Sequence, residues 1–246
     1  MTVKGIVFDI NGTLSDIRTD EWHADVYRVI SNLLSYQGIV LDPAVVKDSY
    51  FQGMQRQLAT SVERYPEFDA TEIFHAIITQ HASDFTRTLP PAKLAQLPGF
   101  LAETYRAAAR FRLQLYPGVE ETLQQLHRKY HLAVISDGQT AYAVPELNAI
   151  GLSAYFNPIL VSGDFGYRKP DERLFAAALA GMQMAASDVV FVGNDMYRDV
   201  FGPQQLGMKT VFFQSNQGTH ADGVQPDYVI YNFPELLDAV RFFEGR

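Results

Sequence analysis

Short apolar runs alternate with helical segments along the second half of the chain, and this alternation most restricts the possible folds. The helical segments are Val119–His127, Pro170–Gly181, a segment through Asp199 and a last one from Pro234. The apolar runs are His131–Ile135, Ile159–Val161, Val189–Val192, Thr210–Phe213 and Tyr228–Ile230. Continuous apolar runs are typical of strands buried on both faces. Because strands that alternate with helices form right-handed βαβ units, the pattern predicts a parallel sheet.

An apolar run also opens the chain, at Gly5–Phe8, but the residues after it follow a different period. Apolar side chains recur at intervals of three and four within Trp22–Leu33, as on one face of a helix. The segment Leu101–Arg112 is rich in Ala and Arg, which favour helices. These features predict an insert of four or five helices after the first strand.

The expected architecture is therefore a Rossmann-like α/β core interrupted by an all-helical domain. Residues 1–14 and 113–246 form the predicted core, and residues 15–112 form the predicted helical cap domain. The insert leaves the core at the carboxyl end of the first strand, which is the edge where open α/β sheets bind ligands. We therefore expect the insert to cover a ligand site.

Composition excludes several classes of function. The formal net charge is −8 and no block of Lys and Arg occurs, which disfavours nucleic acid as a partner. The chain has no cysteine, so disulfides, thiolate catalysis and zinc–thiolate sites are excluded. No apolar run is long enough to span a bilayer, and the first residues lack the features of a signal peptide. These absences predict a cytoplasmic monomer or homodimer without a membrane partner.

Clusters of polar residues follow four of the predicted strands directly. In chain order they are Asp9-Ile10-Asn11-Gly12-Thr13, Ser136-Asp137-Gly138, Gly166-Tyr167-Arg168-Lys169-Pro170, and Gly193-Asn194-Asp195 with Asp199 one helical turn later. Because the carboxyl ends of parallel strands meet at one edge of the sheet, the four clusters are expected to converge.

The residue types in these clusters suit phosphoryl transfer. Asp9 is a carboxylate that can attack phosphorus and form an aspartyl-phosphate. Asp195, together with Asp9, offers the hard oxygen ligands that magnesium takes, and the main-chain carbonyl of Asn11 can add a third. Ser136 can donate to a phosphate oxygen, and the charge of Lys169 can stabilise the transition state.

The order of these motifs resembles the haloacid dehalogenase (HAD) superfamily, in the subgroup with a helical cap inserted after the first motif. Asp9-x-Asn11-Gly12-Thr13-Leu14 looks like its first motif, and Gly193-Asn194-Asp195-x-x-x-Asp199 looks like its fourth. The resemblance extends over the whole predicted core, including Tyr116–Leu123 and Pro226–Ile230. It implies a HAD-like fold and a hydrolase of the phosphatase type.

The resemblance also implies roles for individual residues. Asp9 corresponds to the nucleophile, with Asn11 and Lys169 as its catalytic partners. The magnesium ligands correspond to Asp9, the main-chain carbonyl of Asn11, and Asp195. The phosphate site corresponds to Thr13, Ser136, Asp137, Gly138 and Lys169, with Asn194 and Asp199 as supporting residues.

Asn11 departs from the pattern of the family's phosphatases, which usually carry a second Asp at this position. That Asp protonates the leaving-group oxygen and later activates water. An amide can donate a hydrogen bond but cannot transfer a proton usefully at neutral pH. General acid–base catalysis contributes about two to four orders of magnitude in rate, so Asn11 predicts weak activity on poor leaving groups.

Three functions follow from this sequence. The first is a magnesium-dependent phosphomonoester hydrolase that acts on a small phosphorylated metabolite. The second is a 2-haloacid dehalogenase, in which the same Asp9 attacks carbon without a metal. The carboxylates Asp195 and Asp199 argue against it, because such dehalogenases usually show Ser-Ser-Asn there. The third is a phospho-ligand binding protein with a catalytically weakened HAD site, to which Asn11 points.

Overall fold

A computed structural model describes residues 2–245 and contains one parallel sheet of six strands, in the order β5-β4-β1-β6-β7-β8. The strands are β1 (Gly5–Phe8), β4 (His131–Ser136), β5 (Ile159–Val161), β6 (Val189–Gly193), β7 (Lys209–Phe213) and β8 (Tyr228–Ile230). The predicted α/β core with a parallel sheet is confirmed, and all five strands expected after residue 116 are present within one residue of their predicted ends.

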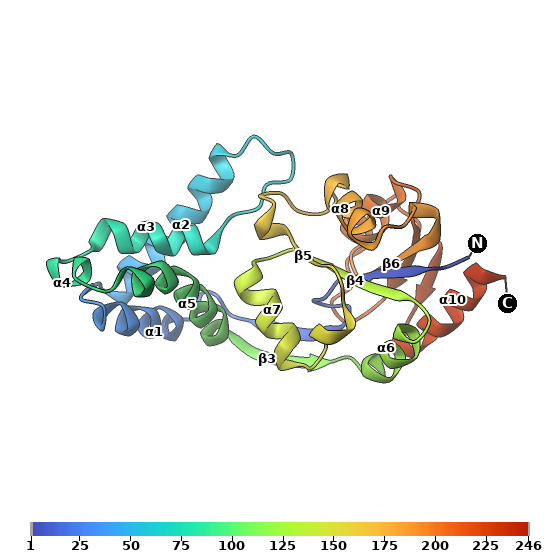
Figure 1. Cartoon of the computed structure of the whole chain (residues 1–246), viewed down its shortest axis with the longest axis horizontal. Helices are drawn as coiled ribbons and strands as arrows, with labels where there is room; N and C mark the ends of the chain where they lie inside the picture. The colour runs from blue at the N-terminus through green and yellow to red at the C-terminus, as the bar shows by residue number, and fades with distance from the viewer. Residues whose placement is uncertain (1, 246) are drawn as a thin grey trace.

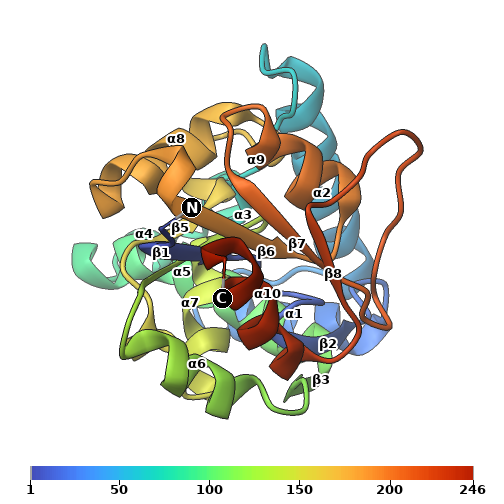
Figure 2. The same ribbon diagram turned by 90° about the vertical axis from the view of Figure 1, so that its right-hand side faces the viewer.

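Helices cover both faces of the sheet (Figure 2). One face packs against α6 (Val119–His127), α7 (Thr140–Ala149) and α10 (Leu236–Glu244), and the other against α8 (Glu172–Met182). The short α9 (Gly202–Gln204) lies on the same side as α8 (Figure 2). Successive residues of β1 alternate between the faces: Ile6 and Phe8 join the first core and Val7 the second. Burial on both faces explains why this strand is apolar throughout.

Residues 20–109 form a separate group of helices, here called the helical insert (Figure 1). Its helices are α1 (Ala24–Ser35), α2 (Pro43–Thr60), α3 (Ala70–His81), α4 (Asp84–Arg87) and α5 (Pro91–Ala109). The insert has its own hydrophobic core, in which Tyr27, Tyr50, Phe74 and Tyr105 are buried. No helix among residues 2–245 is both long and apolar enough to cross a membrane.

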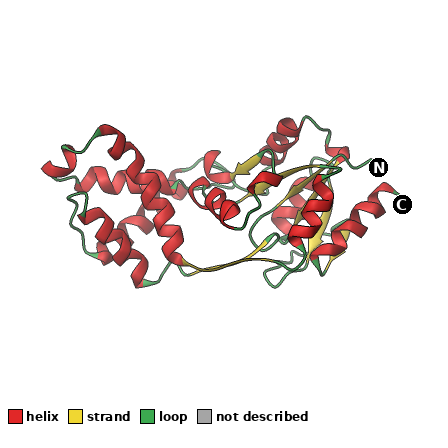
Figure 3. Ribbon diagram, turned by 60° about the horizontal axis from the view of Figure 1, so that its bottom comes forward, coloured by secondary structure: helices red, strands yellow, loops and turns green. Residues whose placement is uncertain are grey.

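The segment expected as entirely helical, residues 15–112, contains strand at both of its ends. β2 (Ser15–Thr19) pairs with β3 (Arg110–Leu115) in an antiparallel ribbon that joins the helical insert to the core (Figure 3). In β3, Leu113 and Leu115 are partly buried while Arg112 and Gln114 are exposed, and Leu113 pairs with the buried Ile17 of β2. The period of two in β3 is a strand pattern. The expectation of a helix to Arg112 was wrong for the last three residues, because their alternation outweighs the helical propensity of Arg.

Two other segments differ from the expectation. α7 was not anticipated, and its sequence contains Pro145 in the helix interior, a residue that normally disfavours a helix. The segment through Asp199 forms a π-helix, Met196–Phe201, rather than an α-helix. The Asp199 carboxylate accepts the backbone N–H groups of Asn194 and Asp195, at 3.1 and 3.0 Å, so it lies beneath the first turn. Wide turns of this kind are frequent at functional sites.

A loop of the helical insert reaches the core and pairs with it. The N–H of Glu67 donates to the carbonyl of Gly166 at 3.0 Å, and the N–H of Arg168 donates to the carbonyl of Tyr65 at 2.9 Å. These bonds form an isolated antiparallel bridge between the two parts. The bridge ends one residue before Lys169, so the loop that carries this lysine is held from the insert side as well as from the core.

Candidate active site

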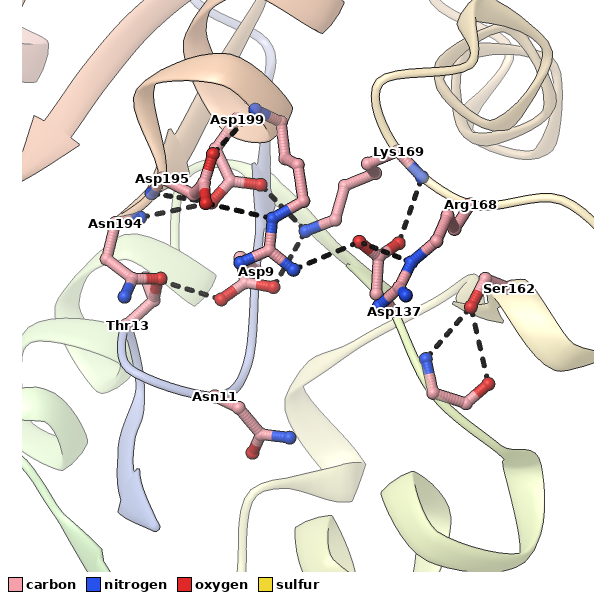
Figure 4. Close-up of polar contacts among 12 residues, drawn as sticks. Asp9, Asn11, Thr13, Asp137, Ser162, Arg168, Lys169, Asn194, Asp195 and Asp199 are labelled. Atoms are coloured by element: carbon pink, nitrogen blue, oxygen red, sulfur yellow. Dashed lines mark hydrogen bonds and ion pairs between the residues drawn. The ribbon is translucent and has the colours of Figure 1, made fainter. Parts of the chain in front are cut away.

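The polar clusters that follow β1, β4 and β6 lie at one edge of the sheet. β1 is the central strand, hydrogen-bonded to β4 on one side and β6 on the other. The carboxyl ends of the three strands are in register, and Asp9 N–H donates to the carbonyl of Val192 at 2.9 Å. The structure therefore brings the residues of the first, second and fourth clusters together (Figure 4).

Lys169 of the third cluster reaches into the centre of this group. Its Nζ donates to Asp9 Oδ1 and to Asp199 Oδ1, each at 2.7 Å. The lysine side chain is 1% exposed. Burial alone would lower the pKa of the Lys169 ammonium, but the carboxylates of Asp199 and Asp9 outweigh burial and raise this pKa above its ordinary value. Lys169 is therefore a fixed positive charge beside one oxygen of Asp9.

The other oxygen of Asp9 is held by Thr13. The Thr13 hydroxyl lies 3.0 Å from Asp9 Oδ2 and 3.2 Å from Asn194 Oδ1, and the Asn194 amide nitrogen donates to the carbonyl of Gln217 at 2.8 Å. Thr13 is completely buried. Its hydroxyl contacts Asp9, so in this arrangement Thr13 orients the carboxylate, whereas the sequence suggested a phosphate contact. Asn194 supports Thr13 in turn.

Two glycines allow the chain to pass close to these side chains. Gly12 has a φ of 85°, and a Cβ at this position would lie 2.3 Å from the amide nitrogen of Asn194. Gly193 leaves room for Asp199, because a Cβ there would lie 2.3 Å from the Asp199 Cβ. Only glycine fits these two positions without displacing Asn194 or Asp199.

Asp195 and Asp199 have different environments. Asp195 Oδ1 caps the π-helix by accepting the N–H of Arg198 at 2.8 Å, and its Oδ2 pairs with Arg198 Nε at 3.0 Å. Asp199 is fully enclosed, and burial raises its pKa to about 7 against the lowering effect of Lys169. Burial lowers the pKa of the Arg198 guanidinium, but Asp199, Asp195 and Asp137 outweigh burial and raise it. The sequence identified Asp195 and Asp199 but not Arg198.

The oxygen donors near Asp9 and Asp195 suit a magnesium ion, although Arg198 is paired with the Asp195 carboxylate in this structure. Among residues 2–245, no group of three or more His, Asp or Glu side chains is placed to hold a metal. The candidate set instead contains two carboxylates, Asp9 and Asp195, and the main-chain carbonyl of Asn11. Hard oxygen donors and remaining water ligands are what magnesium takes. Arg198 must leave Asp195 Oδ2 before that oxygen can face a metal.

The cluster after β4 lies beside this group. Ser136 is buried at the end of β4. The Asp137 carboxylate accepts the N–H of Lys169 at 3.0 Å and lies 3.3 Å from Arg198 NH1. The Gly138 N–H donates to Ser162 Oγ at 2.9 Å. Asp137 and Gly138 are thus hydrogen-bonded to neighbouring parts of the protein, and Ser136 lines the cavity described next.

A cavity of about 150 Å³ opens next to Asn11 and Ser136. Charged residues that the sequence did not single out line it: Glu21, Glu67, Arg106, Glu146 and Arg168. Three of them belong to the helical insert, where no local motif marks them. Arg168 stood inside a quoted cluster, directly before Lys169, and that position was the available signal. The insert and the core thus both contribute to the walls.

Comparisons with known proteins agree with this geometry. A sequence model described as haloacid dehalogenase-like hydrolase matches residues 47–213, more than half of the chain. Glyceraldehyde 3-phosphate phosphatase of Pyrococcus furiosus is 29% identical over 54% of the chain and 57% of that protein. Pyrimidine 5′-nucleotidase PynA of Streptococcus pneumoniae is 25% identical over 98% of the chain and 96% of that protein.

A solved structure supports the fold. The crystal structure of 2-haloacid dehalogenase from Pseudomonas syringae pv. Tomato DC3000 superposes with a TM-score of 0.71, at 21% identity, over 98% of this chain and 100% of that one. The chain spans a little over half the length of the glyceraldehyde 3-phosphate phosphatase that it matches. The matched range of the sequence model begins after β1, so Asp9 lies outside it.

Proposed function

The chain belongs to the haloacid dehalogenase-like hydrolases, and from that premise we propose that it is a magnesium-dependent phosphomonoester hydrolase acting on a small phosphorylated metabolite. Asp9 is the proposed nucleophile, and an aspartyl-phosphate is the proposed intermediate. The observation that carries the proposal is the contact of Lys169 Nζ with Asp9 Oδ1 and Asp199 Oδ1, each at 2.7 Å. A buried carboxylate held between a lysine and a threonine is placed to attack an anionic phosphorus centre.

The reaction proceeds in two displacements at phosphorus. In the first, an oxygen of Asp9 forms a bond to phosphorus, and the bond from phosphorus to the ester oxygen breaks with its electrons leaving on that oxygen, which takes a proton from solvent. In the second, water attacks the phosphorus of the aspartyl-phosphate and gives a proton to solvent, which releases inorganic phosphate and restores the Asp9 carboxylate. Lys169 reduces the repulsion between Asp9 and the phosphoryl oxygens, and Ser136 donates a hydrogen bond to one of them.

Magnesium would be held by Asp9, the main-chain carbonyl of Asn11, and Asp195, and when bound it would neutralise charge on the phosphoryl group. Asp199 keeps Lys169 in place, and Thr13 keeps Asp9 in place. The site has more carboxylates than cations. The carboxylates are those of Asp9, Asp137, Asp195 and Asp199, and the cations are Arg168, Lys169 and Arg198. A divalent cation reverses this balance and favours a bound phosphate dianion.

Asn11 favours a second candidate function, which is binding of a phosphorylated ligand with slow turnover. Its side chain points away from Lys169 and Asp9 in Figure 4, and Asn11 Oδ1 accepts a hydrogen bond from Ser15 Oγ at 3.3 Å. An amide there cannot give a proton to the leaving group. This limit matters for an alkyl ester, whose alkoxide is a poor leaving group, and much less for a phenyl ester.

The test is phosphate release from phenyl phosphate and from an alkyl sugar phosphate, with magnesium and with EDTA. Wild type, Asn11→Asp and Asp9→Asn are compared. We expect magnesium-dependent cleavage of phenyl phosphate by wild type, none by Asp9→Asn, and a gain in Asn11→Asp of about tenfold or more on the alkyl ester. No release by either active variant under any condition contradicts the phosphatase proposal. Chloride release from 2-chloropropionate then tests the dehalogenase, and calorimetry with phenyl phosphate tests the binding protein.

A further inference from the structure

The cavity beside Asn11 and Ser136 is here called the leaving-group cavity, because the proposed reaction would place the leaving group next to Asn11. The charges that line this cavity restrict which leaving groups it can accept. We propose that this cavity binds a small, neutral or cationic leaving group that carries hydroxyl or amino groups, and that it rejects a leaving group with a carboxylate. The inference rests on the proposed phosphatase function, because it concerns the part of the substrate that leaves. It adds the substrate class, which neither the fold nor the motifs supply.

One side of the cavity is formed by Arg106 of α5. Its guanidinium is paired on two sides: Nε lies 2.7 Å from Glu146 Oε1, and NH1 lies 3.2 Å from Glu21 Oε1. The third nitrogen, NH2, lies 3.4 Å from Glu146 Oε2. The cation therefore already has two carboxylates. A ligand carboxylate reaching Arg106 has to compete with one of them.

The other side of the cavity is formed by Arg168 and Glu67. Arg168 Nε lies 3.6 Å from Glu67 Oε2 and 3.6 Å from Asp137 Oδ2. Glu67 accepts hydrogen bonds from the hydroxyl of Ser162 at 2.7 Å and from the N–H of Phe68 at 3.2 Å. Its side chain is 2% exposed. Burial raises the pKa of the Glu67 carboxyl in spite of Arg168. More negative charge beside Glu67 is thus unfavourable.

Arg106 is hydrogen-bonded to two carboxylates, and Arg168 Nε lies 3.6 Å from two others without a hydrogen bond to either. The described lining thus carries four carboxylates, Glu21, Glu67, Asp137 and Glu146, and two guanidinium groups, and Asp137 also lies 3.3 Å from Arg198. A ligand hydroxyl can donate to a carboxylate and accept from a guanidinium, and an ammonium group adds an attractive charge. A ligand carboxylate adds repulsion, above all against Glu67 and Glu146, whose side chains are 2% exposed and therefore weakly screened by water. The same lining that favours the first two groups excludes the third.

The size of the cavity gives a second restriction. A cavity of about 150 Å³ is comparable to one that takes benzene, with about six non-hydrogen atoms. A short polyol or amino alcohol fits this space. A nucleoside exceeds it. Nucleoside monophosphates are therefore expected to be poor ligands of the arrangement seen here.

Three phosphate esters of one length provide the test: 2-hydroxyethyl phosphate, 2-aminoethyl phosphate and phosphoglycolate, which end in a hydroxyl, an ammonium and a carboxylate. Their affinities are measured by calorimetry with magnesium, beside uridine monophosphate. We expect the hydroxyl and ammonium esters to bind at least tenfold more tightly than phosphoglycolate and than the nucleotide. Equal or tighter binding of phosphoglycolate overturns the charge argument, and equal binding of the nucleotide overturns the size argument.

Two variants locate the effect. Glu67→Gln removes one carboxylate of the cavity, and Glu103→Gln removes an exposed carboxylate of α5. We expect Glu67→Gln to improve phosphoglycolate relative to 2-hydroxyethyl phosphate by about threefold or more, and Glu103→Gln to leave the ratio unchanged. If Glu67→Gln fails to fold, Glu21→Gln replaces it, and the wild-type order still decides the question. Phenyl phosphate hydrolysis is measured in parallel, so a failed phosphatase proposal and a failed substrate class give different results.

Discussion

Lys169, which is buried, and Arg106, which is partly buried, have the same pattern of partners and different surroundings. Lys169 lies between Asp9 and Asp199 at the edge of the sheet, with both bonds at 2.7 Å. Arg106 lies between Glu146 and Glu21, where α5 of the helical insert meets α7 of the core. Each cation faces two carboxylates, so each group carries an excess negative charge.

The difference between them lies in the exposure of the second carboxylate. The side chain of Asp199 is 2% exposed, whereas that of Glu21 is 40% exposed. Water can screen the excess charge of the Arg106 group but not that of the Lys169 group. The buried negative charge of the Lys169 group favours binding of a cation or protonation of a carboxylate, and such perturbed groups are typical of reactive centres. A solvated excess charge suits a structural link, and we infer that the Arg106 group joins the insert to the core.

The substitution Asp9→Asn should separate activity from stability most strongly. It removes the proposed nucleophile, so the rate of phenyl phosphate hydrolysis should fall by about 10⁴-fold or more. It also leaves Lys169 paired with Asp199 alone, which ends the excess of buried negative charge. Thermal unfolding should therefore occur at the wild-type temperature or above it. A variant that keeps its rate, or that unfolds at a much lower temperature, contradicts the assignment of Asp9.

The substitution Lys169→Met should damage both properties. Phenyl phosphate hydrolysis should fall by about 10³-fold, because a charge aimed at the phosphoryl group is lost. The free energy of unfolding should fall by about 3–5 kcal/mol, because two buried carboxylates lose their cation. In the double variant Lys169→Met/Asp199→Asn, denaturant unfolding should show partial recovery of stability while the rate stays low. Recovery of the rate would place Lys169 outside the reaction.

The substitution Arg106→Met should affect stability far more than chemistry. Glu146 has a side chain that is 2% exposed and would lose its cation, so unfolding should become easier by about 3 kcal/mol. The kcat for phenyl phosphate should remain within about threefold of wild type, because the phenyl leaving group has no polar group for Arg106 to bind. The double variant Arg106→Met/Glu146→Leu should recover most of the lost stability in denaturant unfolding. A fall in kcat as large as that of Lys169→Met would mean that Arg106, like Lys169, takes part in the reaction, and would contradict a structural role for Arg106.

The sequence predicted the core better than the insert, and the reason is physical. Strands buried on both faces, such as β1 and β6, appear as continuous apolar runs, and polar residues directly after them mark the edge of the sheet. Asp9 and Asp195 could therefore be named as candidates from their positions. Lys169 lies well beyond the end of β5, and its candidacy depended on the resemblance to the HAD motifs. The local alternation in β3 was also visible, but the propensity of Ala and Arg for helices concealed it.

The residues that line the leaving-group cavity could not be predicted in this way. Glu67 lies in a loop of the insert, and Arg106 lies in the last turn of α5; neither belongs to a motif of fixed spacing. Their positions depend on how the insert packs on the core, for example through the bridge between Tyr65–Glu67 and Gly166–Arg168. Contacts between segments so distant in sequence have no local signature. Arg198 was missed for a different reason, since an arginine in a helix is usually a surface residue.

The pH dependence of the stability that Glu67 contributes is the smallest effect expected here. Measuring it tests the charge of the cavity without any ligand. Burial raises the pKa of its carboxyl above the ordinary value of 4.5, so the folded protein holds this proton more tightly than the unfolded chain. The stability due to Glu67 is then complete below about pH 4.5 and is lost as pH rises through the folded pKa. The free energy of unfolding of wild type relative to Glu67→Gln, from denaturant titrations, should therefore decrease as pH rises from about 4 to 8. Other carboxylates titrate alike in both proteins and cancel in the difference. A difference that stays constant or grows with pH would mean that Arg168 and Ser162 compensate the Glu67 charge fully, and the cavity would then not discriminate against a carboxylate.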